Sequence, residues 1–412
     1  MVYLLGSSSF SGSNGLTGVA SRLPKPKKIK VLHLITSLEV GGAQNGLLLG
    51  LPRFDKDRYE HVLCSIMGEV QMAERFTQVG IEVVSLGLKS KYDLMVAVRL
   101  RKLLRTYRPD VLHTYLLHAN VLGRVVGRLS GVDTIIGSER TIGLTNGLRR
   151  IATKLTNPLT DAVEVNAETV GTAAVRDLGV PSRKIEVVRS GFDFSAYKGP
   201  SRRQEIRAEL GLSDETHLVL SAARFRPSKG VEYAIRAFAK AYRERPDSHL
   251  MIAGEGEQFD FLVNLARDLG VSEKTTFLGR RSDVPDLLAA ADSMLLASLN
   301  EGLPRISIEA MAAGRPVIAT DVGATSEVVI DDETGILVQP KDVEAAAGAL
   351  VRLIDDDGLR TRLGETGRQH VEQNYSVDNY VARLDGLYQQ LLGYDATSVE
   401  SSTVNGSMEF RS

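Results

Sequence analysis

The amino-acid sequence predicts an α/β protein made of two doubly wound domains, each with a parallel sheet covered by helices on both faces. The chain has 412 residues, which is long for a single hydrophobic core. Short, nearly continuous apolar runs alternate with helical stretches between residues 28 and 195, as is typical of buried parallel strands. The same alternation resumes after residue 200 and ends near residue 375, which predicts a second domain of the same architecture.

The first series begins with the apolar run IKVLHLIT, followed by a turn at Gly41 and Gly42 and then by the helical segment LLLGL. Further strands are expected where short apolar runs recur, at residues 61–66, 83–86, 110–115, 134–138 and 162–167. We therefore expect residues 28–195 to form a first Rossmann-like domain. The pair Gly199-Pro200 and the polar segment after it predict a hinge.

The second series occupies residues 200–375. Its strands are expected within residues 217–225, 248–256, 275–280, 293–298, 315–320 and 335–340, with helical stretches such as VEYAIRAFAKAY between them. Residues 376–393 have the pattern of an amphipathic helix, which we assign to the first domain as its last element. Residues 1–27 are expected to be a mobile tail without the features of a signal peptide, and residues 394–412 a disordered one.

Composition excludes several classes of protein. The formal net charge is −1, and no apolar run approaches the length of a membrane span, so we expect a cytoplasmic protein. The single cysteine, Cys64, excludes a disulfide within the chain and gives no support to a zinc site. From Lys28 to Phe192, basic residues exceed acidic ones by roughly seven. This excess is modest and no aromatic stacking is interleaved with it, which argues against nucleic acid and allows peripheral contact with an anionic membrane.

The segment ARFRPSKG, after the first strand of the second domain, has the composition of a phosphate-binding turn. Arg224 and Lys229 bracket a Pro/Ser turn, and Gly230 leads into a helix whose amino end offers free N–H groups to an anion. Two cations beside a helix end suit a diphosphate. The alternative interpretation is an exposed loop with solvated charges.

The segment EGLPRISIEAMAAG places two carboxylates around the start of another helix. Glu301 precedes the helix and Glu309 lies within it, while Pro304 suits the first turn. Carboxylates can accept hydrogen bonds from the hydroxyls of a ribose or a sugar, so this pair could hold the two ends of a nucleotide sugar. Either glutamate alone could instead complement the helix dipole.

Gly41 and Gly42 would let the backbone of the first domain approach a ligand closely, although they could equally form an ordinary turn. His113 and His118 flank the end of a predicted strand, so at least one of them could face a cleft between the domains. Such a cleft is expected because ligands of open α/β sheets bind at the carboxyl ends of the strands.

The ordered combination of VGGAQNGLL, ARFRPSKG, IAGEGE, FLGRRSDVPDLLAAADSMLLAS and EGLPRISIEAMAAGRPVIATDVGATSEVV resembles the GT-B fold glycosyltransferases of family 4, or group 1. The resemblance covers residues from about Lys28 to about Leu392 and is most specific after Arg224. It implies that the first domain binds the acceptor and the second the nucleotide-sugar donor. By the same resemblance, Glu309 would bind the ribose and Glu301 the donor sugar.

The resemblance also implies the other contacts of the donor. Arg224 and Lys229 would neutralise the diphosphate, Gly42 with Gly41 would approach the phosphates, and the backbone near Arg280 and Arg281 would contact the base. The segment from Glu301 through Gly302, Leu303 and Pro304 would line the donor site. The chain departs from the family at Gln44, Ser190 and Tyr115, and the last of these leaves His118 as the candidate for the usual cleft histidine.

The family implies transfer with retention of anomeric configuration by front-face attack, in which the leaving phosphate oxygen takes the acceptor proton. The catalytic groups would be Glu301, His118, Arg224 and Lys229. No Asp-x-Asp motif follows a strand, so we expect transfer without a metal or any other cofactor. The partners expected are a nucleoside-diphosphate sugar and a glycan or lipid-linked acceptor.

Two other function classes are compatible with tandem α/β domains. A nicotinamide-dependent oxidoreductase would need a G-x-G-x-x-G fingerprint after the first strand, and the chain has none there. A non-catalytic scaffold of the same fold is the second alternative, because a fold alone does not establish an activity. The combination of Arg224, Lys229, Glu301 and Glu309 argues against it. The sequence leaves the sugar, the base, the acceptor and the oligomeric state open.

Overall fold

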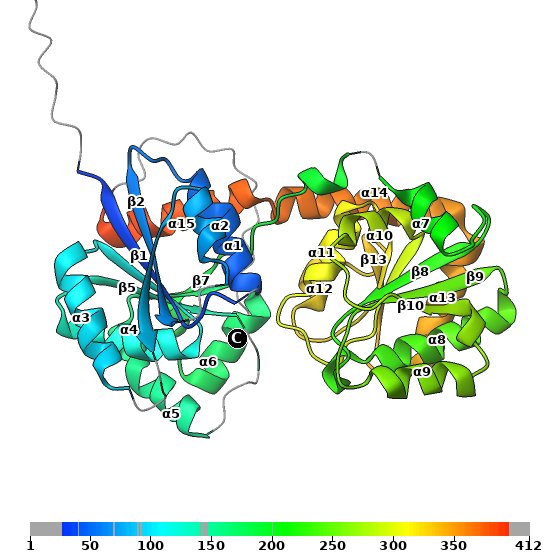
Figure 1. The fold of residues 1–412 in the computed structure, drawn as a ribbon, viewed down its shortest axis with the longest axis horizontal. Coiled ribbons are helices and arrows are strands. Elements are labelled where there is room, and N and C mark those ends of the chain that lie inside the picture. The colour runs from blue at the N-terminus through cyan, green and yellow to red at the C-terminus, as the bar shows by residue number, and fades with distance from the viewer. Residues whose placement is uncertain are drawn as a thin grey trace, which may run out of the picture.

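A computed structural model describes residues 27–39, 41–68, 71–88, 90, 93–140, 142, 147–199 and 201–394. Of the predicted tails, 1–27 and 394–412, all but residues 27 and 394 lie outside the described residues, as does Pro200 of the predicted hinge. The described chain forms two α/β bodies that lie side by side (Figure 1).

The first body is built on a parallel sheet of seven strands in the order β3-β2-β1-β4-β5-β6-β7. Its strands are β1 (Ile29–Ile35), β2 (Tyr59–Met67), β3 (Glu82–Leu88), β4 (Val111–Tyr115), β5 (Thr134–Glu139), β6 (Ala162–Val165) and β7 (Ile185–Val187). The central strand β4 is buried along its whole length because helices cover both faces of the sheet, and its two polar side chains, His113 and Thr114, are hydrogen-bonded.

Helices cover both faces of this sheet. They are α1 (Gly42–Gly50), α2 (Ala73–Gln78), α3 (Met95–Tyr107), α4 (Leu117–Leu129), α5 (Gly147–Thr156) and α6 (Glu168–Leu178). Short 3-10 segments stand at Leu51–Arg53, Asn157–Leu159, Ser182–Lys184 and Ser195–Tyr197. Two separate apolar clusters, one around Leu47 and Phe76 and one around Leu100 and Leu112, fill the two faces.

The second body has a parallel sheet of six strands in the order β10-β9-β8-β11-β12-β13. The strands are β8 (His217–Ala222), β9 (Ser248–Ala253), β10 (Thr275–Phe277), β11 (Ser293–Leu296), β12 (Val317–Thr320) and β13 (Gly335–Val338). The helices are α7 (Arg203–Glu209), α8 (Val231–Glu244), α9 (Phe259–Asp268), α10 (Val284–Ala290), α11 (Arg305–Ala312), α12 (Thr325–Val328), α13 (Val343–Asp355) and α14 (Asp357–Asn374), with 3-10 segments at Pro227–Lys229 and Ser272–Lys274. The predicted fold class, two doubly wound α/β domains, is confirmed.

The chain crosses between the bodies twice, and the two crossings are paired. The Phe192 amide donates to the Tyr375 carbonyl at 2.9 Å, and the Val377 amide donates to the Phe192 carbonyl at 3.1 Å. After the second crossing, α15 (Val377–Leu392) packs against α1 and places Tyr380 and Tyr388 in the core of the first domain (Figure 1). The last helix therefore belongs spatially to the first domain, although it follows the second in sequence.

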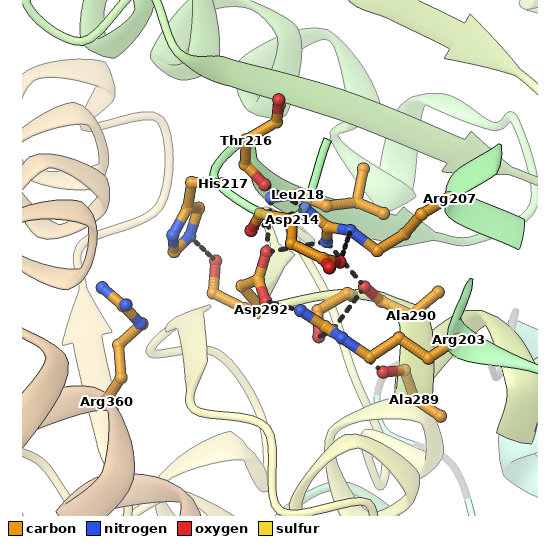
Figure 2. A network of polar contacts seen from close by, with 12 residues as sticks. Arg203, Arg207, Asp214, Thr216, His217, Leu218, Ala289, Ala290, Asp292 and Arg360 are labelled. Atoms are coloured by element: carbon orange, nitrogen blue, oxygen red, sulfur yellow. Dashed lines mark hydrogen bonds and ion pairs between the residues drawn. The ribbon is translucent and has the colours of Figure 1, made fainter. Parts of the chain in front are cut away.

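A partly buried ionic network fixes α7 to the amino ends of β8 and β11 in the second domain (Figure 2). Arg203 and Arg207 reach the Asp292 carboxylate at 2.8 and 3.1 Å, and Arg203 also donates to the Ala290 carbonyl at 2.8 Å. Asp292 in turn accepts from the Leu218 amide at 2.8 Å. This network lies at the amino ends of the strands and serves stability, whereas ligands of such sheets bind at the carboxyl ends.

Candidate functional site

A cavity of about 360 Å³ lies between the two domains, at the carboxyl ends of their strands. Both domains contribute to its lining, and α1 and α11 begin at it. The lining residues are Gly41, Gly42, Ala43, Gln44, Leu116, Arg140, Asn166, Ser190, Gly302, Leu303 and Arg305. Four of the predicted donor-binding residues, two from each domain, therefore meet at one cavity.

Lys229 and Glu301, which are far apart in sequence, form an ion pair beside this cavity. The Lys229 Nζ lies 2.7 Å from Glu301 Oε1, and the same oxygen accepts a hydrogen bond from Ser298 Oγ at 2.7 Å. Glu301 is only 8% exposed, so its carboxylate is held in one place and fixes the ammonium group of Lys229. The structure thus brings together two of the four residues predicted to be catalytic.

The loops that carry this pair pack so closely that glycine is required on both sides. Gly230, at φ 58°, would place a Cβ 2.0 Å from the Ala297 carbonyl oxygen. Gly323, also at φ 58°, would place one 1.7 Å from the carbonyl oxygen of Glu301. A side chain at either position would displace the segment that ends in Glu301.

Arg224 follows β8 and is exposed, close to the loops that follow β9 and β10. The Phe225 amide donates to the Glu255 carbonyl at 2.8 Å, and the Gly254 amide donates to the Gly279 carbonyl at 2.8 Å. These bonds bring the loop of Arg224 near Arg280 and Arg281. The Arg280 guanidinium lies 3.6 Å from Glu255, and the Arg281 Nε donates to Asp283 at 2.7 Å.

Glu309 lies on α11, one turn after Arg305. Burial raises the pKa of the Glu309 carboxyl, and the Arg305 guanidinium opposes part of this shift. Pro304, the residue just before α11, is buried, while Gly302 and Leu303 line the cavity. The start of α11 therefore faces the cavity, and Glu309 lies behind it on the same helix.

The first domain presents the start of α1 to the start of α11. Gly41 stands at the amino end of α1, and a Cβ on Gly42 would lie 3.5 Å from Arg305 Cδ of the second domain. Gly41, the residue before the first turn of α1, has no side chain that could cap that turn. Free N–H groups and the positive end of the helix dipole therefore point to the cavity across from Arg305.

Arg140 is a cavity residue that sequence reasoning missed. Its Nη2 donates to the two Glu164 carboxylate oxygens at 2.8 and 3.1 Å, and its Nη1 donates to Ser190 Oγ at 3.2 Å. Burial alone would raise the pKa of Glu164, but Arg140 and His113 hold it below its ordinary value. The position of Arg140, directly after the strand TIIGSE, was the available signal, because the ends of parallel strands meet at one edge.

Neither candidate histidine is among the residues that line the cleft cavity. His113 is fully buried, with its Nδ1 2.9 Å from the Tyr388 hydroxyl and its Nε2 3.6 Å from Glu164. His118 is exposed at the start of α4 and lines a different, apolar cavity. A catalytic role for His118 stays a prediction. His113 is buried away from the cavity, so any influence it has on the cleft would pass through its contact with Glu164.

The described residues contain neither a metal-binding cluster nor a helix that could span a membrane. No group of three or more His, Cys, Asp or Glu side chains in the described ranges is arranged to hold a metal ion. Within those ranges, no helix combines the length and apolar character needed to cross a membrane. The prediction of transfer without a metal stays a prediction.

Comparison with known families assigns both halves of the chain. Residues 202–370 match the family described as "Glycosyl transferases group 1", and residues 40–196 match that described as "Glycosyltransferase Family 4". The chain is 28% identical over 333 residues to N-acetyl-alpha-D-glucosaminyl L-malate synthase of Bacillus anthracis, which covers 78% of this chain and 85% of that protein. It is 24% identical over 380 residues to UDP-Gal:alpha-D-GlcNAc-diphosphoundecaprenol alpha-1,3-galactosyltransferase of Escherichia coli, at 88% and 97% coverage.

Solved structures share the same fold. Anabaena Alr3699/HepE in complex with UDP superposes with a TM-score of 0.79 at 22% identity. The superposition covers 88% of this chain and 100% of the Anabaena chain. A glycosyltransferase from Rickettsia africae ESF-5 gives a TM-score of 0.79 at 17% identity, over 89% and 100% of the two chains. Both superpositions extend across the two domains.

Proposed function

Because this chain belongs to the group 1, family 4 glycosyltransferases and has their GT-B fold, we propose that it transfers a hexosyl group from a UDP- or GDP-linked sugar with retention of configuration. The acceptor would be a hydroxyl of a glycan or of a lipid-linked sugar. The observation that carries the proposal is the Lys229–Glu301 pair, set beside a cavity on which two helix amino ends converge.

The charges around the cavity suit a leaving diphosphate. Lys229 and Arg224 come from the loop before α8, and α1 and α11 both begin at the cavity. Fixed cations and helix amino ends stabilise the negative charge that develops as the bond between sugar and phosphate breaks. In this assignment Glu301 orients both Lys229 and the donor sugar, and Glu309 accepts hydrogen bonds from the ribose hydroxyls.

Retention by front-face attack needs no separate strong base. The acceptor hydroxyl approaches on the face that the diphosphate leaves, and the departing phosphate oxygen takes its proton. Holding the hydroxyl close to the anomeric carbon is then the main task of the first domain. Arg140, fixed by Glu164 and Ser190, is placed to orient a polar acceptor group at the cavity.

The acceptor class follows from the relatives and the charge distribution. One relative is named for L-malate as acceptor and another for a diphosphoundecaprenol-linked sugar, so named acceptors among the relatives carry anionic groups. The basic excess of the first domain is consistent with such an acceptor and with work at the cytoplasmic face of a membrane. Asn166, which also lines the cavity, has a buried Oδ1 without a hydrogen-bond partner among the described residues, so this oxygen is available to a hydroxyl of the substrate.

Calorimetric titration of UDP, GDP and ADP into the full chain tests the donor assignment. We expect one diphosphate to bind at micromolar concentration and Glu309→Ala to weaken it at least about tenfold, as loss of hydrogen bonds to two hydroxyls predicts. Glu365→Ala, at an exposed position on α14, is the matched control and should bind like the wild type. No binding of any diphosphate would refute the proposal and favour a non-catalytic scaffold.

A further inference from the structure

The first domain contains a second, larger cavity, which we call the apolar groove. Its volume is about 620 Å³, and it is bounded by the ends of β1, β2 and β3 and by α3, α4 and α5. Apolar side chains from four of these elements dominate its wall, among them Ile66, Met67, Leu88, Val121 and Leu122. α4 packs against both α3 and α5, and the three helices lie together in the lower part of the first domain (Figure 1).

Consecutive residues of the chain line the cleft cavity and the apolar groove. Leu116 lines the cleft cavity, whereas the next two residues, Leu117 and His118, line the apolar groove. The turn between them is tight, because Leu116 has a φ of 70° before α4 starts. One ligand could therefore place a polar end in the cleft and an apolar chain in the groove, on either side of this turn.

Apolar side chains continue from the groove onto the surface. Leu94, which lines the groove, is 84% exposed, and Leu148 and Leu155 on α5 are 85% and 73% exposed. With Ile151, the two α5 leucines are spaced three and four residues apart, so they form one stripe along the helix. Contiguous exposed apolar surface on a soluble domain marks a contact with a partner or a lipid.

Basic residues accompany this apolar stripe, which identifies the partner. On α5, Arg149 and Lys154 are exposed beside the stripe, and on α3, Arg101 and Arg105 are exposed beyond Leu94. An apolar face bordered by cations is complementary to a membrane surface with anionic headgroups, and a polar protein partner would not need the apolar stripe.

We propose that the apolar groove binds the hydrocarbon chain of a lipid acceptor, taken from an anionic membrane on which the α3–α5 face rests. The inference rests on the proposed transferase function, because the acceptor headgroup would then lie in the cleft beside Arg140. His118, at the junction of the two cavities, contacts the acceptor where headgroup and chain meet. The substrate class is thus a membrane lipid with a polar hydroxylated head.

Fluorescence of cis-parinaric acid, with displacement by farnesyl phosphate, tests the groove. The wild-type chain should bind the probe saturably, and Val121→Trp, which fills the groove, should weaken binding at least tenfold. Leu129→Trp, on the same helix but outside the groove, should bind like the wild type. Ala97→Phe fills the groove from α3 and keeps the test valid if Val121→Trp does not fold. Equal binding by all variants, or no saturable binding, would overturn the inference.

Sedimentation with phosphatidylcholine vesicles, with and without phosphatidylglycerol, tests the membrane face. Removing the charges of Arg149 and Lys154 by glutamine substitutions should lower partition onto the anionic vesicles by about 30-fold. The matched pair Arg243→Gln and Arg267→Gln removes two exposed charges from the second domain and should change nothing. Equal partition onto both kinds of vesicle would refute the membrane face.

Titration of UDP and GDP into the same samples separates the two proposals. Diphosphate binding without parinaric acid binding would refute the groove and leave the transferase proposal standing. Parinaric acid binding without diphosphate binding would refute the transferase proposal and the acceptor role with it, and would leave only a lipid site.

Discussion

Gly323 offers the sharpest test of how the second domain positions its candidate catalytic pair. In Gly323→Ala, the new Cβ would lie 1.7 Å from the Glu301 carbonyl oxygen, half the 3.4 Å at which ordinary contact begins. The segment of Glu301 must therefore move. We expect the free energy of unfolding to fall by about 1 kcal/mol from the left-handed backbone and by about 1–3 kcal/mol more from the crowding.

The functional cost should exceed the loss of stability. A shift of this size at Glu301 would also displace Lys229, which is held by its carboxylate. Misplacement by roughly 1 Å at a positioning group costs on the order of 100-fold in rate, so transfer should fall by that factor once the donor and acceptor are known. Affinity for the preferred diphosphate, measured by calorimetry, should fall in parallel.

Gly314 provides the matched control, because it has a similar backbone but open space around it. Its φ is 68°, and a Cβ there would meet no atom of the described residues within 4 Å. Gly314→Ala should lose only the backbone contribution of about 1 kcal/mol in denaturant unfolding and should keep the wild-type diphosphate affinity. If the two variants lose the same stability and bind alike, close packing against Glu301 does not position the site.

Three further predictions concern ionisable groups. Burial raises the pKa of Glu309, so diphosphate affinity should fall as the pH is lowered toward that pKa, and Glu309→Gln should give a flat profile in calorimetry. Across the domain interface, the Glu327 carboxylate accepts hydrogen bonds from the Thr169 amide at 2.7 Å and from the Thr169 hydroxyl at 2.5 Å. Glu327→Ala should therefore open the cleft and raise the radius of gyration measured by X-ray scattering. An unchanged radius of gyration would contradict this prediction. Asp292→Asn should lower the free energy of unfolding by about 3 kcal/mol at pH 7. Burial raises the pKa of Asp292, but the Leu218 amide and Arg203 more than offset this and hold the pKa below its ordinary 3.8. The stabilisation by the Asp292 carboxylate is therefore complete above pH 3.8 and is lost as the pH falls through the lower pKa of the folded state. Asp292→Asn should not show this loss in acid unfolding.

The layer architecture could be predicted because buried parallel strands leave an unambiguous pattern. Runs such as IKVLHLIT and SMLLAS are largely apolar on both faces. In the structure the first forms β1, inside the seven-stranded sheet, and the second forms β11, inside the six-stranded sheet. The meeting of Gly42, Lys229 and Glu301 near one cavity followed from the same reasoning, since each lies in the segment between the end of a strand and the first residue of the next helix, and the carboxyl ends of strands face the cleft.

The polar interior of the first domain could not be predicted, because lateral neighbours in a parallel sheet are separated in sequence by crossover helices. His113, Arg140 and Glu164 come from three successive strands, and only the order β4-β5-β6 places them side by side. In the folded chain His113 and Arg140 share the buried Glu164 carboxylate. His113, which is expected near the cleft from the sequence, is thus buried in the core behind it, and Arg140 is the residue that reaches the cavity. Because a buried carboxylate is stable only when it is paired, replacing Arg140 would leave Glu164 uncompensated, so the cleft residue and the core that holds it cannot vary independently.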